Sequence, residues 1–222
     1  DLAVVVVAAG LGTRLGADKP KAFVNLAEKT LLQHALENLA DAPALEQVII
    51  AVPVGHEEQT AKLADVALAG KRVRFDVVVG GDTRQQSIAN ALGVIDPEVE
   101  VVLVHDAARA LAPSSLFTRV ASEVRRSGMG AVPLMKIADT IKRVDGDVVQ
   151  DTVDRNSLRA AQTPQGFVAV KLIDAYAAAK SDYTDDAALA QAHGMKINAV
   201  EGDERAFKIT TADDLTAAEL RF

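Results

Sequence analysis

"LAVVVVAAGLGTRLGADKPKAF", residues 2–23, decides the fold that we expect. Residues 2–8 form a continuous apolar run, the pattern of a strand covered on both faces. The loop after it holds three glycines and three cations within a few residues: Gly10, Gly12, Gly16, Arg14, Lys19 and Lys21. Glycines let backbone N–H groups approach a ligand that a Cβ would block, and such N–H groups with nearby cations bind phosphate. We therefore predict an anion-binding loop in preference to a solvated turn.

Two familiar phosphate-binding motifs do not fit this loop. The dinucleotide fingerprint G-x-G-x-x-G fails because Gly10 and Gly12 are followed by Leu15 and only then by Gly16. The Walker pattern fails because no Gly-Lys-Ser/Thr occurs. The predicted phosphate site is therefore of another kind.

Strand-like and helix-like segments alternate along most of the chain. We expect strands over 2–8, 47–52, 73–79, 99–104 and 131–135. We expect helices after the cap Thr30, over 56–68, over 84–92, from Pro113 onward, and over 168–179 and 185–193. A strand pair over 197–200 and 206–209 and a helix capped by Thr211 end the chain. The pattern predicts one α/β domain over residues 1–222, with a Rossmann-like, mostly parallel sheet and helices on both faces.

Residues 137–154 interrupt this alternation. Asp145-Gly146 lies between two β-favouring runs, 140–144 and 148–153, and Asp-Gly is a strong hairpin signal. An isolated two-stranded hairpin is marginal in water, so this one needs a surface to pack on. Its apolar residues are Ile141, Val144, Val148, Val149 and Val153. We predict a projecting arm that joins two subunits into a homodimer. The alternative is that the hairpin folds back on its own sheet.

Composition excludes several classes of protein. Of the 222 residues, 49% are hydrophobic and none is cysteine, which removes disulfides, thiolate zinc sites and cysteine nucleophiles. The net charge of −7 does not support a nucleic-acid partner. No apolar run approaches the ~20 residues of a membrane span. We expect a cytoplasmic enzyme or binding protein without a nucleic-acid or membrane partner.

Two further strand ends carry candidate functional residues. Gly80-Gly81 end the third predicted strand. By spacing alone, we expect Asp82, which follows them, to be the N-cap of the next helix and to have no further role. His105 and Asp106 follow the fourth strand. A carboxylate that faces a phosphate loop is a natural Mg²⁺ ligand, and the alternative is an ion pair between Asp106 and Arg109. We expect His105 to be structural.

Three polar insertions lie between apolar stretches in the second half of the chain. They are "TVDRN" at 152–156, "TPQGF" at 163–167 and "FKITTADDL" at 207–215. Taken singly, Arg155, Thr163 and Lys208 are most simply read as surface residues.

Taken in order, these segments resemble one family. The A-A-G-x-G-T-R loop with K-P-K resembles the triphosphate-binding loop of sugar and alditol-phosphate nucleotidyltransferases. "GGDTRQQS", "VHDAAR", Asp139-Thr140, "TVDRN", "TPQ" and "FKIT" add a close resemblance to the 2-C-methyl-D-erythritol 4-phosphate cytidylyltransferases of the non-mevalonate isoprenoid pathway. The resemblance extends over residues 4–215.

The resemblance implies that CMP passes from CTP to the methylerythritol phosphate, with release of pyrophosphate and with Mg²⁺ present. It implies that Arg14 and Lys21 are catalytic, stabilising the charge of the transition state. The implied CTP-binding residues are Ala8, Ala9, Gly10 and Gly12 at the triphosphate, Gly81, Asp82 and Ser87 at the cytosine, and Ala107 at the ribose. The implied substrate-binding residues are Asp106, which is also near the metal, Arg109, Thr140, Arg155, Thr163 and Lys208.

Two positions depart from the family pattern. Ala110 stands where the family often has proline, and we expect it to loosen that loop. Asp186 replaces the glutamate of the family's T-D-E-A segment. Two other functions stay open: a cytidylyltransferase for another alditol phosphate, such as ribitol 5-phosphate, and a nucleotide-binding regulator without turnover. The intact set of Arg14, Lys21 and Asp106 argues against the regulator.

Overall fold

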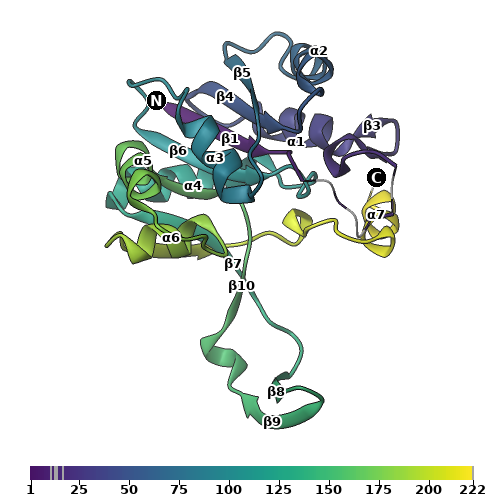
Figure 1. The fold of residues 1–222 in the computed structure, drawn as a ribbon, viewed down its shortest axis with the longest axis vertical. Helices are drawn as coiled ribbons and strands as arrows, with labels where there is room; N and C mark the ends of the chain where they lie inside the picture. Colours follow the sequence, from purple (N-terminus) through teal and green to yellow (C-terminus); the bar gives the residue numbers. More distant parts are fainter. Residues whose placement is uncertain (11, 13–14, 17, 222) are drawn as a thin grey trace.

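The main sheet places parallel strands at the centre of the molecule. The structure is a computed structural model that describes residues 1–10, 12, 15–16 and 18–221. The strands are β1 (Leu2–Val7), β4 (Leu45–Val52), β5 (Arg74–Val79), β6 (Val101–Asp106), β7 (Gly130–Lys136), β10 (Arg159–Ala161), β11 (Gln165–Val168) and β12 (Ile197–Glu201). Their order is β10-β7-β11-β6-β1-β4-β5, with β12 paired to β7 (Figure 1). Only β10 and β11 run antiparallel to their neighbours, which confirms the predicted mostly parallel sheet.

Helices cover both faces of this sheet, because alternate residues of the buried strands point to opposite sides. Leu2, Val4 and Val6 join a core with α1 (Leu31–Leu39), α2 (Glu57–Ala67) and α4 (Ser114–Ser127). Ala3 and Val5 join the opposite core, with α3 (Arg84–Leu92), α5 (Ala169–Ala178) and α6 (Asp186–Ala192). The apolar run of β1 is therefore continuous because both of its faces are buried.

Predicted caps hold the ends of two helices. The hydroxyl of Thr30 accepts from the N–H of Gln33 at 3.1 Å at the start of α1. Thr211 caps α7 (Ala212–Glu219) in the same way, accepting from Asp214 N–H at 3.2 Å. In the part of the chain that is described, no helix has the length and apolar character needed to cross a membrane.

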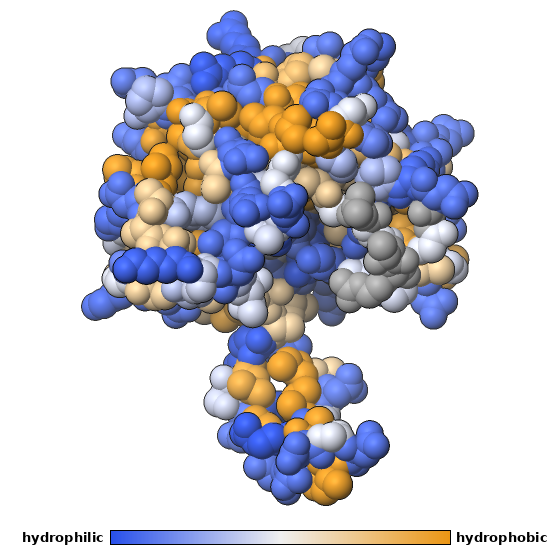
Figure 2. Space-filling model, in the orientation of Figure 1, coloured by the Kyte–Doolittle hydropathy of each residue, from blue (hydrophilic) through white to orange (hydrophobic). Residues whose placement is uncertain are grey.

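The hairpin β8 (Ile141–Asp145) and β9 (Val148–Val153) forms a two-stranded sheet of its own. It projects from the body as an arm (Figure 1), and Gly146 in its turn has a positive φ of 56°. Val144, Val148 and Val149 are exposed on it, and Figure 2 shows hydrophobic surface, in orange, on the arm. The arm is thus confirmed as a projecting element, and the structure of one chain leaves its apolar residues uncovered.

One predicted strand is wrong, and several short strands escaped prediction. Residues 206–209 do not form a strand: a 3-10 turn, Glu204–Ala206, begins there because Asp203 accepts from Arg205 N–H at 2.9 Å. The segment after it runs beside a loop, where Ile209 N–H donates to Ala108 C=O at 2.9 Å. The strands missed are β10, β11 and the small hairpin of β2 (Asn25–Leu26) and β3 (Lys29–Thr30).

Candidate active site

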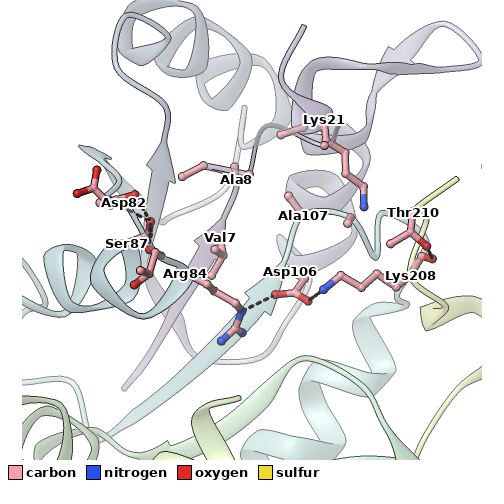
Figure 3. A pocket seen from close by; sticks show the side chains of 17 residues that line it. Val7, Ala8, Lys21, Asp82, Arg84, Ser87, Asp106, Ala107, Lys208 and Thr210 are labelled. Atoms are coloured by element: carbon pink, nitrogen blue, oxygen red, sulfur yellow. Dashed lines mark hydrogen bonds and ion pairs between the residues drawn. The ribbon is translucent and has the colours of Figure 1, made fainter. Parts of the chain in front are cut away.

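A pocket of about 520 Å³ lies beyond the carboxyl ends of β1 and β6. In doubly wound sheets this edge is where ligands bind. Four segments line the pocket: the loop after β1, the start of α3, the end of β6 and the segment before α7 (Figure 3). All of the predicted CTP-binding residues meet here: Ala8, Ala9, Gly10, Gly12, Gly81, Asp82, Ser87 and Ala107.

The loop after β1 brings backbone and cation together on one side of the pocket. Gly12 has a φ of +67°, and a Cβ there would lie 2.4 Å from the Cβ of Lys21. Only glycine allows this close approach. The side chain of Lys21 extends into the pocket toward Ala107 and Thr210 (Figure 3). Arg14, the other predicted catalytic cation, lies outside the described residues.

The loop before α3 forms the opposite wall. The hydroxyl of Ser87 accepts from Gly81 N–H at 3.1 Å and donates to the carbonyl of Thr83 at 2.9 Å. A Cβ on Gly80 would lie 2.5 Å from the Cβ of Ala9, so the two loops pack directly on each other. Thr83 is the N-cap of α3, and the reading of Asp82 as the cap is wrong. Asp82 is left exposed, and its side chain points away from Asp106 (Figure 3).

Asp106 is held by two cations from different parts of the chain. Arg84 Nε donates to one carboxylate oxygen at 3.1 Å, and Lys208 Nζ lies 2.8 Å from the other (Figure 3). Burial alone would raise the pKa of Asp106, but these two cations hold the pKa well below its ordinary value. Asp106 is therefore a carboxylate with a fixed orientation. The alternative pairing with Arg109 is wrong: Arg109 donates to the carbonyls of Ala206, at 2.7 Å, and Ala161, at 3.3 Å.

Thr163 bonds to the backbone of Asp106, and His105 in turn contacts Thr163. The Thr163 hydroxyl accepts from Asp106 N–H at 3.0 Å and lies 3.1 Å from His105 Nδ1. Burial lowers the pKa of His105 to about 4, since the charged form would be desolvated. His105 is fully buried, with its ring 4.8 Å from that of Phe117. This supports the structural role expected for His105.

The predicted substrate residues do not all reach the pocket. Asp106 and Lys208 line it, and Thr163 bonds to Asp106. Thr140 and Arg155 are exposed at the base of the arm, where Arg155 donates to the carbonyl of Ala138. Arg109 does not line the pocket either, since its guanidinium donates to backbone carbonyls. Of the predicted substrate residues, a single subunit therefore brings only Asp106 and Lys208 to the pocket wall.

Comparisons with known proteins identify the family of this chain. Residues 2–222 match the model of the IspD family, 2-C-methyl-D-erythritol 4-phosphate cytidylyltransferase. The chain belongs to this family. The prediction of a cytidylyltransferase, a nucleotidyltransferase of isoprenoid synthesis, is thereby confirmed.

Relatives of the IspD family support the assignment along the whole chain. The chain is 47% identical to the bifunctional enzyme IspD/IspF of Clavibacter michiganensis, covering 98% of this chain and 53% of the relative, about half its length. It is 46% identical to the 2-C-methyl-D-erythritol 4-phosphate cytidylyltransferase of Rhodococcus opacus, covering 96% and 92%. The crystal structure of that enzyme from Thermus thermophilus superposes with a TM-score of 0.79 at 36% identity, covering 98% and 97%.

The donor set fits a metal held mainly by substrate phosphates. The described residues contain no group of three or more acidic, histidine or cysteine side chains that could hold a metal by themselves. Mg²⁺ needs only one or two carboxylates when phosphates supply further ligands. A carboxylate offers about four lone-pair positions, and the two cations use only part of those of Asp106.

Arg84 is a charged site residue that the sequence analysis missed. It occupies the first position of α3, where the helix dipole disfavours a cation. An arginine at such a position needs an anionic partner, and this was the available signal. Ala110, expected to loosen its loop, is fully buried, and its carbonyl accepts from Asn38 Nδ2 at 2.8 Å.

Proposed function

We propose that this protein transfers CMP from CTP to 2-C-methyl-D-erythritol 4-phosphate and releases pyrophosphate. The observation that carries the proposal is that the glycine loop, Lys21 and the ion pair of Asp106 with Lys208 line one and the same pocket. A phosphate oxygen of the alditol attacks the α-phosphorus of CTP in line, and the bond from that phosphorus to the pyrophosphate oxygen breaks. No covalent enzyme intermediate is needed, because the attacking phosphate oxygen is already ionised.

The loop after β1 is assigned to the triphosphate. The backbone at Ala8, Ala9, Gly10 and Gly12 is assigned to its phosphates because these residues line the pocket, and glycine at position 12 lets the loop pack directly on Lys21. Arg14 and Lys21 are assigned as catalytic residues, which neutralise the charge that develops on the α-phosphate and on the departing pyrophosphate. The side chain of Lys21 in the pocket supports this role.

The base and the ribose are assigned to the opposite wall. Gly80 packs on Ala9 and Gly81 packs on Gln86 so closely that a Cβ on either glycine would clash, which fixes the position of this wall. Gly81, Asp82 and Ser87 are assigned to the edge of the cytosine, and Ala107 to the ribose. Backbone groups of the loop and the hydroxyl of Ser87 supply the polar contacts.

The alditol phosphate is assigned to the cations and polar groups around Asp106. Lys208, Arg109 and Thr163 come from the body of the same subunit and lie around the end of β6. Thr140 and Arg155 belong to the base of the arm. Both arginines and Lys208 offer charge-assisted hydrogen bonds to the phosphate.

Mg²⁺ is the proposed metal, with Asp106 as its protein ligand. When bound, Mg²⁺ neutralises phosphate charge and orients the triphosphate. We expect Mg²⁺ and CTP together to raise the thermal midpoint more than CTP alone, through mass action. Equal midpoints with and without the metal would remove the metal from this site.

We also propose a homodimer in which the arm, residues 137–154, packs on the second subunit of a single-domain chain. Val144, Val148 and Val149 are 57–62% exposed on the arm, which supports a partner surface. Thr140 and Arg155 flank the two ends of the hairpin, so exchange of arms would bring both to the neighbouring pocket. A cytoplasmic location and the absence of nucleic-acid and membrane partners stay predictions.

Pyrophosphate release tests the proposed reaction. CTP and Mg²⁺ are supplied with 2-C-methyl-D-erythritol 4-phosphate, with ribitol 5-phosphate or with no acceptor. Release that occurs with the methylerythritol phosphate, but not with ribitol 5-phosphate or without an acceptor, supports the proposal. Preference for ribitol 5-phosphate would reassign the substrate. CTP binding without release with either acceptor would favour a regulator without turnover.

A further inference from the structure

Asp186 is a fully buried carboxylate that the proposed chemistry does not use. It is 0% exposed at the start of α6. Arg84 Nη2 donates to one of its oxygens at 2.8 Å, and the hydroxyl of Tyr176 donates to the other. Burial and the charge of Asp186 raise the pKa of Tyr176 well above its ordinary value, so the phenol stays protonated and donates.

Arg84 joins this buried carboxylate to the active site. Its Nε donates to Asp106 at 3.1 Å while its Nη2 donates to Asp186 at 2.8 Å. The planar guanidinium can hold two carboxylates at fixed angles, which the single ammonium of a lysine cannot do. Tyr176, Asp186, Arg84 and Asp106 thus form one hydrogen-bonded chain from α5 to the pocket.

The charges of the four ionised side chains in this hydrogen-bonded network sum to zero. Asp106 and Asp186 carry two negative charges, and Arg84 and Lys208 carry two positive charges. Without Asp186 the group would carry a net positive charge beside the triphosphate. Asp186 therefore holds one end of the Arg84 guanidinium and offsets its charge.

A second set of hydrogen bonds joins α3 to the segment between α5 and α6 and does not involve Asp106. Gln85 Nε2 donates to the carbonyl of Ser181 at 3.1 Å, and Gln85 Oε1 accepts from Tyr183 N–H at 2.9 Å. These bonds fasten the start of α3 to the loop between α5 and α6. They provide an internal control for support that is merely structural.

We propose that Arg84, held by Asp186 and Tyr176, is a positioning residue that orients the carboxylate of Asp106 toward the hydroxyl groups of the alditol phosphate. This inference rests on the proposed function. Arg84 on α3 and Lys208 on the segment before α7 each form an ion pair with a different oxygen of Asp106. The remaining lone pairs of Asp106 then face the pocket with a fixed direction, which benefits the acceptor substrate more than CTP.

The test compares four variants with the unchanged protein: Arg84→Lys, Asp186→Asn, Tyr176→Phe and Gln85→Ala. Pyrophosphate release gives kcat and KM for the alditol phosphate, and calorimetric titration gives Kd for CTP. We expect Arg84→Lys and Asp186→Asn to lower kcat/KM for the alditol phosphate by about tenfold or more, the scale of one charged hydrogen bond. The Kd for CTP, measured without Mg²⁺ so that the proposed contact between Asp106 and the metal does not contribute, should change less than about twofold, and Gln85→Ala should leave both values nearly unchanged.

The outcomes separate this inference from the proposed function. Equal losses for CTP and the alditol phosphate, or the same loss in Gln85→Ala, would overturn the positioning role and leave general support of the loop. If the ion-pair variants do not fold, Tyr176→Phe decides. A selective fall of about threefold, from one lost hydrogen bond, supports the inference, and no fall overturns it. An unchanged protein that releases no pyrophosphate would instead remove the proposed function.

Discussion

The pocket edge of the sheet and the hairpin arm present predicted substrate residues in opposite settings. At the pocket edge, the Asp106 side chain is 10% exposed, and both of its oxygens are paired with cations. On the arm, Thr140 and Arg155 are exposed, and the valines beyond them are uncovered (Figure 2). In the body, ion pairs with Arg84 and Lys208 hold the Asp106 carboxylate in one orientation. In the described residues of one subunit, no surface packs on the exposed side chains of Thr140 and Arg155.

This difference separates two tasks. The anion loop, Lys21 and Asp106 all belong to the body and line one pocket, so under the proposed assignment the body holds the triphosphate with a carboxylate beside it. The arm contributes to substrate binding only where another surface meets it. Variants in the two regions should therefore fail in different ways, and the difference can be measured.

The largest effect is expected in the body, from Lys21→Ala. Because Lys21 is assigned to the charge of the transition state, kcat should fall by roughly 10²-fold or more, with a smaller change in KM for CTP. Steady-state pyrophosphate release measures both values. The matched control is Lys29→Ala, since Lys29 pairs with Glu37 on the surface at 2.7 Å and should leave kcat nearly unchanged. A normal kcat with weaker CTP binding would make Lys21 a triphosphate anchor only.

The second prediction tests whether the arm works on the neighbouring subunit. Lys21→Ala and Arg155→Ala proteins are each expected to be nearly inactive. After subunit exchange, mixed dimers would place both lesions in one site and leave the other intact, so about a quarter of the full activity should return. Pyrophosphate release before and after mixing measures this recovery.

The control for this experiment pairs two lesions of the body. Lys21→Ala mixed with Asp106→Asn leaves no intact site in a mixed dimer, because both residues line the pocket of one subunit. Activity should stay low there. If the Lys21→Ala and Arg155→Ala mixture also stays inactive despite proven heterodimers, the arm serves its own subunit.

The sequence predicted the body well because its signals are local. The continuous apolar run of β1 follows from burial on both faces, and Thr30 and Thr211 cap helices by hydrogen bonds three residues away. The glycines around the pocket were also readable, since a Cβ at Gly12 would meet Lys21. Such features need only neighbouring residues, so a single sequence displays them.

Features that depend on distant contacts were not predicted. Arg84 bonds to residues 22 and 102 positions away, and no spacing rule connects them. The short strands β10 and β11 have three and four residues, too few for a periodic pattern. Residues 206–209 looked like a strand because they include apolar side chains. Phe207 and Ile209 instead pack in a small core beside Ala110 and α7.

The third prediction concerns the apolar residues of the arm. Val148→Asp should raise the dissociation constant of the dimer by at least about tenfold, because each subunit would lose the burial of one valine and bury a charge. Sedimentation velocity over a range of concentrations measures this. CTP affinity per subunit should be unchanged, since the body binds the triphosphate.

The control for this variant lies on the body. Val66 on α2 is 64% exposed, similar to the 62% of Val148, and Val66→Asp should leave the dimer intact. If both variants dissociate to the same degree, general charge repulsion explains the effect. If neither dissociates, the arm does not form the interface.

The smallest effect is expected at the C-terminal segment of the body, and it depends on pH. Asp214 accepts from the hydroxyl and N–H of Thr210, at 2.7 and 2.8 Å, and from Thr211 N–H at 2.8 Å. The side-chain bond from Thr210, with the two backbone bonds, lowers the pKa of Asp214 to about 2. A carboxyl with a lowered pKa in the folded state stabilises the fold above its unfolded pKa, and this contribution is lost as the pH falls through the folded value.

The free energy of unfolding should therefore decrease as the pH falls from about 4 to about 2, the window set by the lowered pKa of Asp214. Because this carboxylate is largely solvent-accessible and screened, we expect its part to be under ~1 kcal/mol. Urea titrations of the unchanged protein and of Asp214→Asn measure it, with Asp213→Asn as control from the same first turn of α7. Asp214→Asn should flatten the pH profile, and Asp213→Asn should not. Equal profiles for the two variants would mean that helix-end charge, and not the bonds from Thr210 and Thr211, holds the segment that carries Lys208 in place.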